Sequence, residues 1–199
     1  MSERHPREKM IQSALVLMGT NGVEATSFSQ VIEHSGAPRG SIYHHFPGGK
    51  AQLVEEATRY AGDMVAGVFN DALGKGDPIA GLMAVGDFWR GVLHDSDFSA
   101  GCPVLAAAVE NDSLPGARDA ARESFQRFQA LHIQLLTQAG VPRERAQSLA
   151  AIAVSAIEGA IILARTQHSN APLDRVLDEL HSLFADALRQ VGRAGDPGQ

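Results

Sequence analysis

Cysteine, basic charge and β-strand patterning are all scarce in this sequence. One cysteine, Cys102, stands among 199 residues, so no disulfide can form within the chain. Because disulfides persist mainly in oxidising compartments, a chain without one is expected in a reducing compartment. Hydrophobic residues make up 44% of the sequence and charged residues 20%, which is ordinary for a globular protein.

Long apolar runs are missing as well. No run approaches the roughly 20 residues that a membrane-spanning helix needs. The stretch 10–18 follows three basic residues and could suggest a signal peptide, but Glu3 and Glu8 interrupt its basic region and no small-residue cleavage site follows. We therefore expect a cytoplasmic protein with no membrane partner.

Basic charge is in deficit overall but not everywhere. The net charge is −6, yet residues 1–50 carry five basic and four acidic side chains, whereas the remainder carries 12 and 19. This asymmetry fits a small DNA-reading module attached to an acidic body.

Catalytic and metal-binding patterns are also lacking. The sequence has no Gly-rich phosphate loop, no nucleophile elbow and no metal-ligand spacing. The pair His44-His45 does not predict a metal site, because adjacent residues on a helix point about 100° apart. Cys102 is interpreted as a buried hydrophobic residue rather than a redox sensor, since only Arg90 and His94 lie near it as cations. We expect no enzyme, no cofactor and no metal.

Helix signals, by contrast, recur along the whole chain and predict an all-α fold of about nine helices. Pro6 suits a first helical turn, and Asn21-Gly22 ends that helix. Ser27 to Gln30 form a capping box, and Pro38 is expected to open the next short helix. Longer helices are expected over about 50–73, from Pro78, over about 114–139 with a cap at Asn111-Asp112-Ser113, from Gly140 to about His168, and from Pro172 to about Val191.

Two short helices joined by a tight turn at 28–46 form a candidate helix-turn-helix. On the second helix, Ile42 and Phe46 lie four residues apart and are expected to face inward. Arg39, Tyr43 and His44 then lie on other faces. A guanidinium and aromatic donors are groups that a helix in the major groove uses to contact bases and phosphates.

The run from Thr26 to Phe46, with its Gly-x-Ile-Tyr-x-His-Phe ending, resembles the DNA-binding signature of TetR-type repressors. The resemblance covers about the first 55 residues. Phe46-Pro47-Gly48-Gly49-Lys50 and Gly101-Cys102-Pro103 resemble the LmrA/YxaF-like branch. Regulators of that branch control efflux or detoxification genes in response to aromatic small molecules such as flavonoids.

The resemblance implies roles for individual residues. Groove or nearby phosphate contacts are expected from Arg39, Ser41, Tyr43 and His44, and phosphate contacts from Ser27, His45 and Lys50. Gly40 would let the recognition helix approach DNA closely, and Tyr43 could instead be a half-buried core residue. Two departures bear on these roles: Pro38 stands where the class has Ser or Thr, and the loop after Phe46 is one residue longer, which affects the position of Lys50.

Two domains and a tail are expected. Residues 1–48 form a three-helix DNA-binding domain, residues 49–192 a helical ligand-binding and dimerisation domain, and residues 193–199 a flexible tail. A homodimer is expected through the last two helices. The last helix has more apolar residues than one stripe facing the core requires: Leu173, Val176, Leu177, Leu180, Leu183, Phe184, Ala187, Leu188 and Val191. On the preceding helix, residues spaced four apart form a row that would join the interface: Ser155, Gly159 and Leu163.

Clustered aromatics suggest an effector pocket, although they could equally fill the core. The candidates are Phe69, Met83, Phe88, Trp89, Phe125, Phe128, His132 and Glu158. Glu158 stands in an apolar stretch and needs a partner, either Arg90, His132 or Arg165, or a ligand. The sequence thus predicts a ligand-responsive regulator, a repressor that binds a palindromic operator as a dimer and is released by a small aromatic or hydrophobic effector. The alternative, an all-helical enzyme or carrier, would not need the stretch 26–46.

Overall fold

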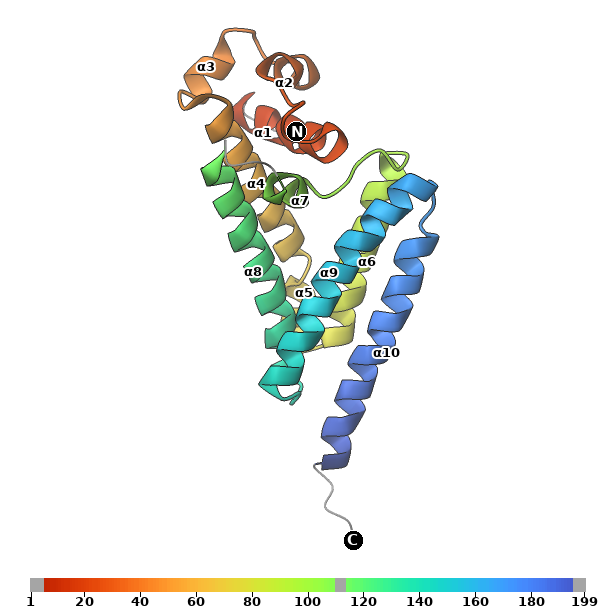
Figure 1. Cartoon of the computed structure of the whole chain (residues 1–199). Coiled ribbons are helices and arrows are strands. Elements are labelled where there is room, and N and C mark those ends of the chain that lie inside the picture. Colours follow the sequence, from red (N-terminus) through yellow and green to blue (C-terminus); the bar gives the residue numbers. More distant parts are fainter. Residues whose placement is uncertain (1–5, 110–113, 195–199) are drawn as a thin grey trace. The chain divides into compact units, whose positions relative to one another are not determined.

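The computed structural model describes residues 6–109 and 114–194, and within these ranges the chain forms helices and no strands. Ten helices are present there (Figure 1). Their bounds are α1 Pro6–Asn21, α2 Phe28–Ser35, α3 Ser41–His45, α4 Gly49–Gly67, α5 Asn70–Lys75, α6 Pro78–Asp95, α7 Pro103–Ala108, α8 Pro115–Gln138, α9 Arg143–Gln167 and α10 Ala171–Ala194. The predicted all-α fold is confirmed.

Most helix ends lie where the sequence placed them. Gly22 takes a left-handed φ of 83° directly after α1. Before α6, the Asp77 carboxylate accepts a hydrogen bond from the Ala80 amide at 2.9 Å, and Pro78 occupies the first turn. Both features follow the preference for a capping carboxylate and an early proline. The cap predicted at Asn111-Asp112-Ser113 lies outside the described residues, as do residues 195–199 of the predicted tail.

Two helix boundaries differ from the sequence prediction. The helix expected to run from Lys50 to about Leu73 is divided into α4 and α5 by a turn at Val68 and Phe69. Gly67 weakens the helix there because it has no side chain to pack and high backbone entropy. The turn leaves Phe69 fully buried, with 1% of its surface exposed. Burial of this ring thus takes precedence over the continuous helical pattern.

The helix expected to open at Pro38 instead begins at Ser41. Residues 38–40 form a turn, in which the Ser41 amide donates to the Pro38 carbonyl oxygen at 2.9 Å. α3 is therefore only five residues long, and Arg39 lies in the turn that precedes it.

Internal contacts divide the chain into two compact units. One comprises residues 1–64 and 100–124, and the other residues 65–99 and 125–199. In the first unit α1 packs against α2, α3 and α7, around fully buried side chains such as Met10, Met18 and Phe46. The functional division at residues 48 and 49 stays a prediction.

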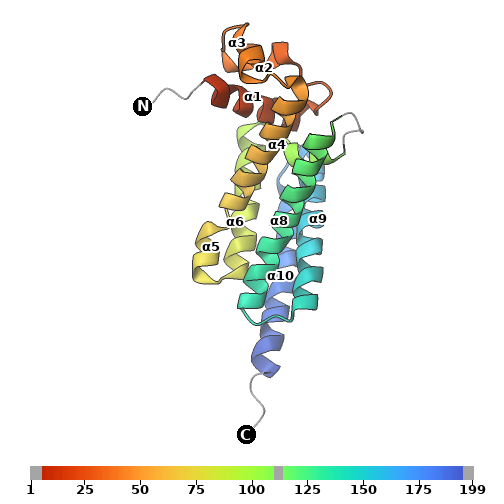
Figure 2. The same ribbon diagram turned by 90° about the vertical axis from the view of Figure 1, so that its left-hand side faces the viewer.

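The second unit is a helical bundle. In it α6, α9 and α10 pack on one another, and α5 packs on α6. Figures 1 and 2 both show α9 and α10 running side by side. Its core includes Leu135, Leu149 and Phe184, each without exposed surface.

The sequence was expected to contain no apolar segment long enough to span a membrane, and α9 contradicts this expectation. By length and composition it could do so, with a mean hydropathy of 1.8 over its most apolar window. Core helices of soluble proteins share this composition. Eight of its residues are buried in the bundle, including Leu149, Ile157 and Ile161, which favours a core role for this helix.

Candidate functional site

The helix-turn-helix is held by a local network at each of its corners. Ser27 caps α2 by accepting a hydrogen bond from the Gln30 amide, while the Gln30 side chain accepts from the Ser27 amide at 2.8 Å. Gly36 ends α2 in the left-handed region, with φ of 67°. Ile42 and Phe46 anchor α3, since neither has exposed surface. Because these two face inward, the neighbouring side chains Tyr43 and His44 are exposed, as the spacing predicted.

An open groove between α2 and α3 has an aromatic wall. The Tyr43 ring meets the Phe28 ring edge-on, with centroids 5.5 Å apart, and Tyr43 is 68% exposed. The groove is lined by Phe28, Ser29, Ile32, Glu33, Arg39 and Tyr43. Neither Arg39 nor the Tyr43 hydroxyl has a hydrogen-bond partner among the described residues. Both polar groups are thus available to an outside partner.

Two other groups predicted to contact DNA already form hydrogen bonds within the protein. The Ser41 hydroxyl donates to the Pro38 carbonyl oxygen at 2.7 Å, so it would have to leave this acceptor to bind a phosphate. The Lys50 ammonium donates to the Glu24 carbonyl oxygen at 2.8 Å and ties the start of α4 to the segment before α2. Gly40 directly precedes α3, where an added Cβ would meet no atom within 4 Å.

The rings of the two adjacent histidines meet edge-on. Their ring centroids are 5.4 Å apart; His44 is exposed and His45 half-buried. Among the residues that the structure describes, no group of three His, Cys, Asp or Glu side chains could hold a metal ion.

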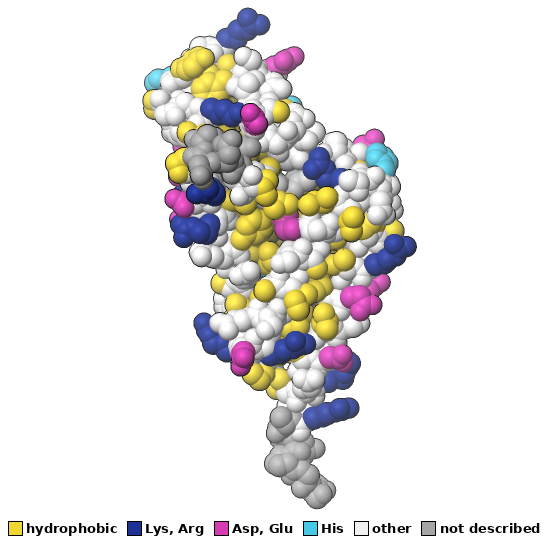
Figure 3. Space-filling model, in the orientation of Figure 1, with side chains coloured by type: hydrophobic (Ala, Val, Ile, Leu, Met, Phe, Trp, Pro, Cys, Tyr) yellow, Lys and Arg dark blue, Asp and Glu magenta, His cyan; other side chains and the backbone are white. Residues whose placement is uncertain are grey.

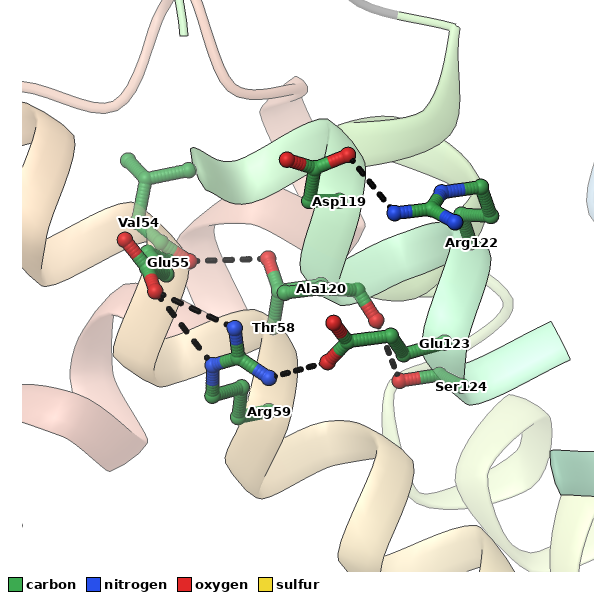
Figure 4. Close-up of polar contacts among 9 residues, drawn as sticks. All are labelled: Val54, Glu55, Thr58, Arg59, Asp119, Ala120, Arg122, Glu123 and Ser124. Atoms are coloured by element: carbon green, nitrogen blue, oxygen red, sulfur yellow. Dashed lines mark hydrogen bonds and ion pairs between the residues drawn. The ribbon is translucent and has the colours of Figure 1, made fainter. Parts of the chain in front are cut away.

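Within the first unit, ion pairs connect α1 to α4 and α4 to α8. Arg7 of α1 pairs with Glu56 of α4 at 2.5 Å. Figure 4 shows Arg59 of α4 between Glu55 of the same helix and Glu123 of α8. The hydrogen bond with Glu123 is the main cause that raises the pKa of the Arg59 guanidinium. These pairs connect the middle of α4 to α1 and to the first half of α8.

A small cavity of about 20 Å³ lies within the second unit. Five of the eight predicted pocket residues line it, namely Phe69, Trp89, Phe128, His132 and Glu158. Met83, Phe88 and Phe125 do not line it and are half-buried elsewhere. In this conformation the cavity has room for about one water molecule.

His132 is the distinctive side chain of this cavity. It is 2% exposed, and its Nδ1 is buried without a hydrogen-bond partner. The rings of Phe69 and Phe184 meet it edge-on, with centroids 4.9 and 5.8 Å away. Burial in this setting lowers the pKa of the imidazole to about 4, so that it is neutral near pH 7.

Sequence reasoning missed four residues that line the cavity. The missed residues are aliphatic: Val65, Val85, Val154 and Ile157. Helical spacing places Val85 four residues from Trp89 and Val154 four residues from Glu158, which could have indicated them. Arg90, considered as a partner for Glu158, instead bonds Asp174 and Asp87, each at 2.7 Å.

The outer face of α9 carries exposed apolar side chains, in the region where Figure 3 shows hydrophobic side chains gathered. Ile152, Ile162 and Leu163 are each 44–49% exposed. In the same predicted row, Ser155 is exposed and an added Cβ at Gly159 would meet no atom within 4 Å.

α10 supplies less free apolar surface than its composition suggested. Five of the nine predicted apolar residues are buried within their own unit: Leu173, Leu177, Leu180, Phe184 and Ala187. The remaining four, Val176, Leu183, Leu188 and Val191, are half-buried. The exposed apolar surface of this pair of helices therefore lies mainly on α9.

Two family models match the chain in tandem. Residues 10–57 match the bacterial regulatory proteins of the tetR family, and residues 78–179 match the LmrA/YxaF-like transcriptional regulator C-terminal domain. The chain belongs to the TetR family of transcriptional regulators. Members of the TetR family are DNA-binding regulators rather than enzymes, which confirms the class and branch that the signature indicated.

Relatives of the TetR family match over nearly the whole chain. The uncharacterized HTH-type transcriptional regulator Rv0196 of Mycobacterium tuberculosis is 42% identical, over 94% of this chain and 98% of its own length. LmrA of Bacillus subtilis is 32% identical, over 87% and 93%. A TetR transcriptional regulator from Legionella pneumophila shares the fold with a TM-score of 0.82 at 22% identity, over 92% of this chain and 98% of its own.

Proposed function

We propose that the protein is a cytoplasmic repressor that binds a palindromic operator as a homodimer and leaves it when a small hydrophobic or aromatic effector binds. The observation that carries the DNA-binding part is the surface of α3. Buried Ile42 and Phe46 fix this helix, and it presents the exposed Tyr43 beside Arg39, whose guanidinium has no partner among the described residues. Arginine in this position can bind guanine or phosphate.

Phosphate contacts would come from the groups around this helix. Ser27 at the start of α2 and His44 on α3 are exposed, while His45 and Lys50 are half-buried. Lys50 would act chiefly by holding the segment before α2 in place, because its ammonium already binds the Glu24 carbonyl. Gly40 leaves room for the DNA backbone at the start of α3.

A homodimer is supported by the outer face of α9. Exposed Ile152, Ile162 and Leu163 surround the open position at Gly159. Paired apolar faces with small residues let two helices approach closely, and burial would remove this surface from water. In a dimer with two-fold symmetry, the two copies of α3 would contact half-sites about 34–36 Å apart, or at that spacing adjusted by DNA bending.

An effector site is supported by the cavity around His132. It combines aromatic and aliphatic walls with two polar side chains, which is the usual composition of a small-molecule site. A ligand larger than water must enlarge this cavity. It would therefore favour a conformation different from the one described, which is the condition for a ligand to shift DNA affinity.

Selection of duplexes from a random pool by the full-length protein tests the proposal. We expect enrichment of one inverted repeat by the natural protein and none by the double variant Arg39→Ala, Tyr43→Ala. Arg122→Ala, on an exposed part of α8, is the matched control and should enrich the same repeat. Failure of the natural protein to enrich any sequence, or enrichment of the same repeat by the double variant, would overturn the proposal.

A further inference from the structure

The polar side chains of the cavity in the second unit include an acid and no basic group that is charged near pH 7. Nine described residues line this cavity, and of these only His132 and Glu158 are polar. Burial lowers the pKa of His132 to about 4, so its imidazole is neutral and adds no positive charge. Arg90 does not line the cavity and pairs instead with Asp87 and Asp174. Among the described residues, the charge of the lining is therefore that of the Glu158 carboxylate.

Glu158 lies in an apolar part of α9. Its neighbour Ile157 is 4% exposed, and Val154, one helical turn earlier, lines the same cavity. A carboxylate in such surroundings is costly unless it meets a cation or hydrogen-bond donors. Its two oxygens offer about four acceptor sites, so it can bind a ligand and still keep a contact within the protein. Glu158 can thus serve as the counter-ion of a bound cation.

The other lining residues also suit a ligand that carries a cation on an apolar body. Phe69, Trp89 and Phe128 supply aromatic rings, and a cation over the face of such a ring is attracted to it. The Nδ1 atom of His132 is buried without a hydrogen bond, and in one tautomer of the neutral ring it accepts from an N–H group. An anion in the same place would lie beside a carboxylate without a counter-ion.

We propose that the cavity takes an apolar amine in its protonated form, whose ammonium group binds the Glu158 carboxylate while its hydrocarbon part packs among the aromatic and aliphatic side chains. This inference rests on the proposed effector site and specifies the charge of its ligand. Like any effector larger than water, the amine must enlarge the cavity to enter it.

Four probes of one shape test the proposal: 1-ethyl-4-propylbenzene, 4-propylbenzyl alcohol, 4-propylbenzylamine and 4-propylbenzoate. Trp89 is the only tryptophan and lines the cavity, so quenching of its emission reports binding. Hydrogen bonds to charged groups contribute more than neutral ones, so the amine should bind at least about five-fold tighter than the alcohol. The benzoate should bind at least about 100-fold more weakly than the amine.

Substitutions at Glu158 separate its charge from its shape. Glu158→Gln keeps the size of the side chain and removes the charge, so the amine should lose its advantage over the alcohol. Glu158→Asp keeps the charge on a shorter side chain and should retain part of that advantage. Glu144→Gln is the matched control, because it makes the same change at an exposed position of α9 that does not line the cavity. It should leave all four affinities unchanged, and circular dichroism verifies the fold of each variant.

Four results would overturn the inference: equal binding of the amine and the alcohol by the natural protein, tighter binding of the hydrocarbon or the benzoate, no binding of any probe, or an undiminished advantage of the amine in Glu158→Gln. Operator binding by the natural protein, measured by fluorescence anisotropy, is a separate readout. A natural protein that binds its operator without preferring the amine contradicts this inference alone. A natural protein that binds no operator contradicts the proposed function.

Discussion

At the scale of the residue, His132 makes the stability of the folded protein depend on pH. Its pKa is about 4 in the folded protein, because burial disfavours the imidazolium, against about 6.5 in the unfolded chain. Between these values the unfolded state binds the proton and the folded state does not, so the free energy of unfolding falls as the pH falls from about 6.5 to 4. The stability is fully present above pH 6.5, and below pH 4 no more is lost.

We expect His132 to account for a loss of about 3 kcal/mol in the free energy of unfolding across that window. The measurement is urea unfolding at a series of pH values for the natural protein and His132→Leu. Glu158 lines the same cavity, so the comparison of the two proteins isolates the part that belongs to the imidazole. Parallel curves for both proteins between pH 6.5 and 4 would show that His132 takes up its proton in the folded state.

A second prediction at this scale separates the role of the Tyr43 ring from that of its hydroxyl group. The ring packs on Phe28, whereas the hydroxyl has no partner among the described residues. Tyr43→Phe should weaken specific operator binding by about 1–3 kcal/mol if the hydroxyl contacts a base, with the groove wall intact. Anisotropy titrations on the selected operator measure this loss. An unchanged affinity for Tyr43→Phe, with a loss only for Tyr43→Ala, would assign the ring alone to recognition.

Residue spacing predicted which side chains of α3 are buried, but not which aromatic residues line the cavity. Ile42 and Phe46 lie four apart on a short helix, and this periodicity alone places both inside. It could not separate Trp89, which lines the cavity, from Phe88, which does not, because which faces meet depends on how four helices pack. Nor could it show that Lys50 and Ser41 are bonded to backbone carbonyls, since both acceptors come from turns.

At the scale of the element, α1 depends on a close backbone contact. The Gly101 amide donates to the Gly19 carbonyl oxygen at 2.9 Å, and a Cβ at Gly19 would lie 2.7 Å from the Gly101 carbonyl oxygen. Such a separation is too short, and because the obstacle is backbone the chain must move. The missing side chain of Gly19 thus allows α1 to pack on the segment that leads into α7.

Two glycine-to-alanine substitutions should therefore act in opposite directions. Gly19→Ala should destabilise the protein by about 1–3 kcal/mol through the forced shift. Gly91 lies inside α6, is exposed and has no atom within 4 Å of an added Cβ, so Gly91→Ala should stabilise it by about 0.5–1 kcal/mol. Thermal unfolding of both variants measures the difference. A stabilised Gly19→Ala variant would mean that the contact between α1 and residue 101 is not maintained.

The sequence predicted helix ends that are capped by a local side chain, but not those whose position depends on tertiary packing. Ser27 with Gln30 and Asp77 with Pro78 mark their own helix starts by local hydrogen bonds and fixed φ. The break between α4 and α5 has no comparable mark, and it follows from burial of Phe69. The proline at position 38 suggested a helix start three residues too early, because a proline fits turns as well as first helical turns.

At the scale of the whole molecule, the proposed function makes DNA recognition depend on dimer formation. A single recognition helix of five residues offers few base contacts, and a palindromic operator is read only when two copies bind together. The exposed apolar side chains of α9 are the surface that such a dimer would bury. Since Leu163 is 48% exposed and Gly159 leaves open space in the single chain, a charge in this row would be forced into the interface.

Leu163→Lys should therefore convert the protein to a monomer at micromolar concentration without loss of helix content, because a buried unpaired ammonium is costly. Sedimentation velocity gives the oligomeric state, and anisotropy with whole and half operators gives the consequence: a large loss of affinity for the inverted repeat and little change for a half-site. Val16→Lys is the matched control, since Val16 is also an exposed apolar residue, at 42%, but lies on α1. That variant should remain a dimer. A dimeric Leu163→Lys protein that binds the inverted repeat as before would place the two-fold interface elsewhere than on α9.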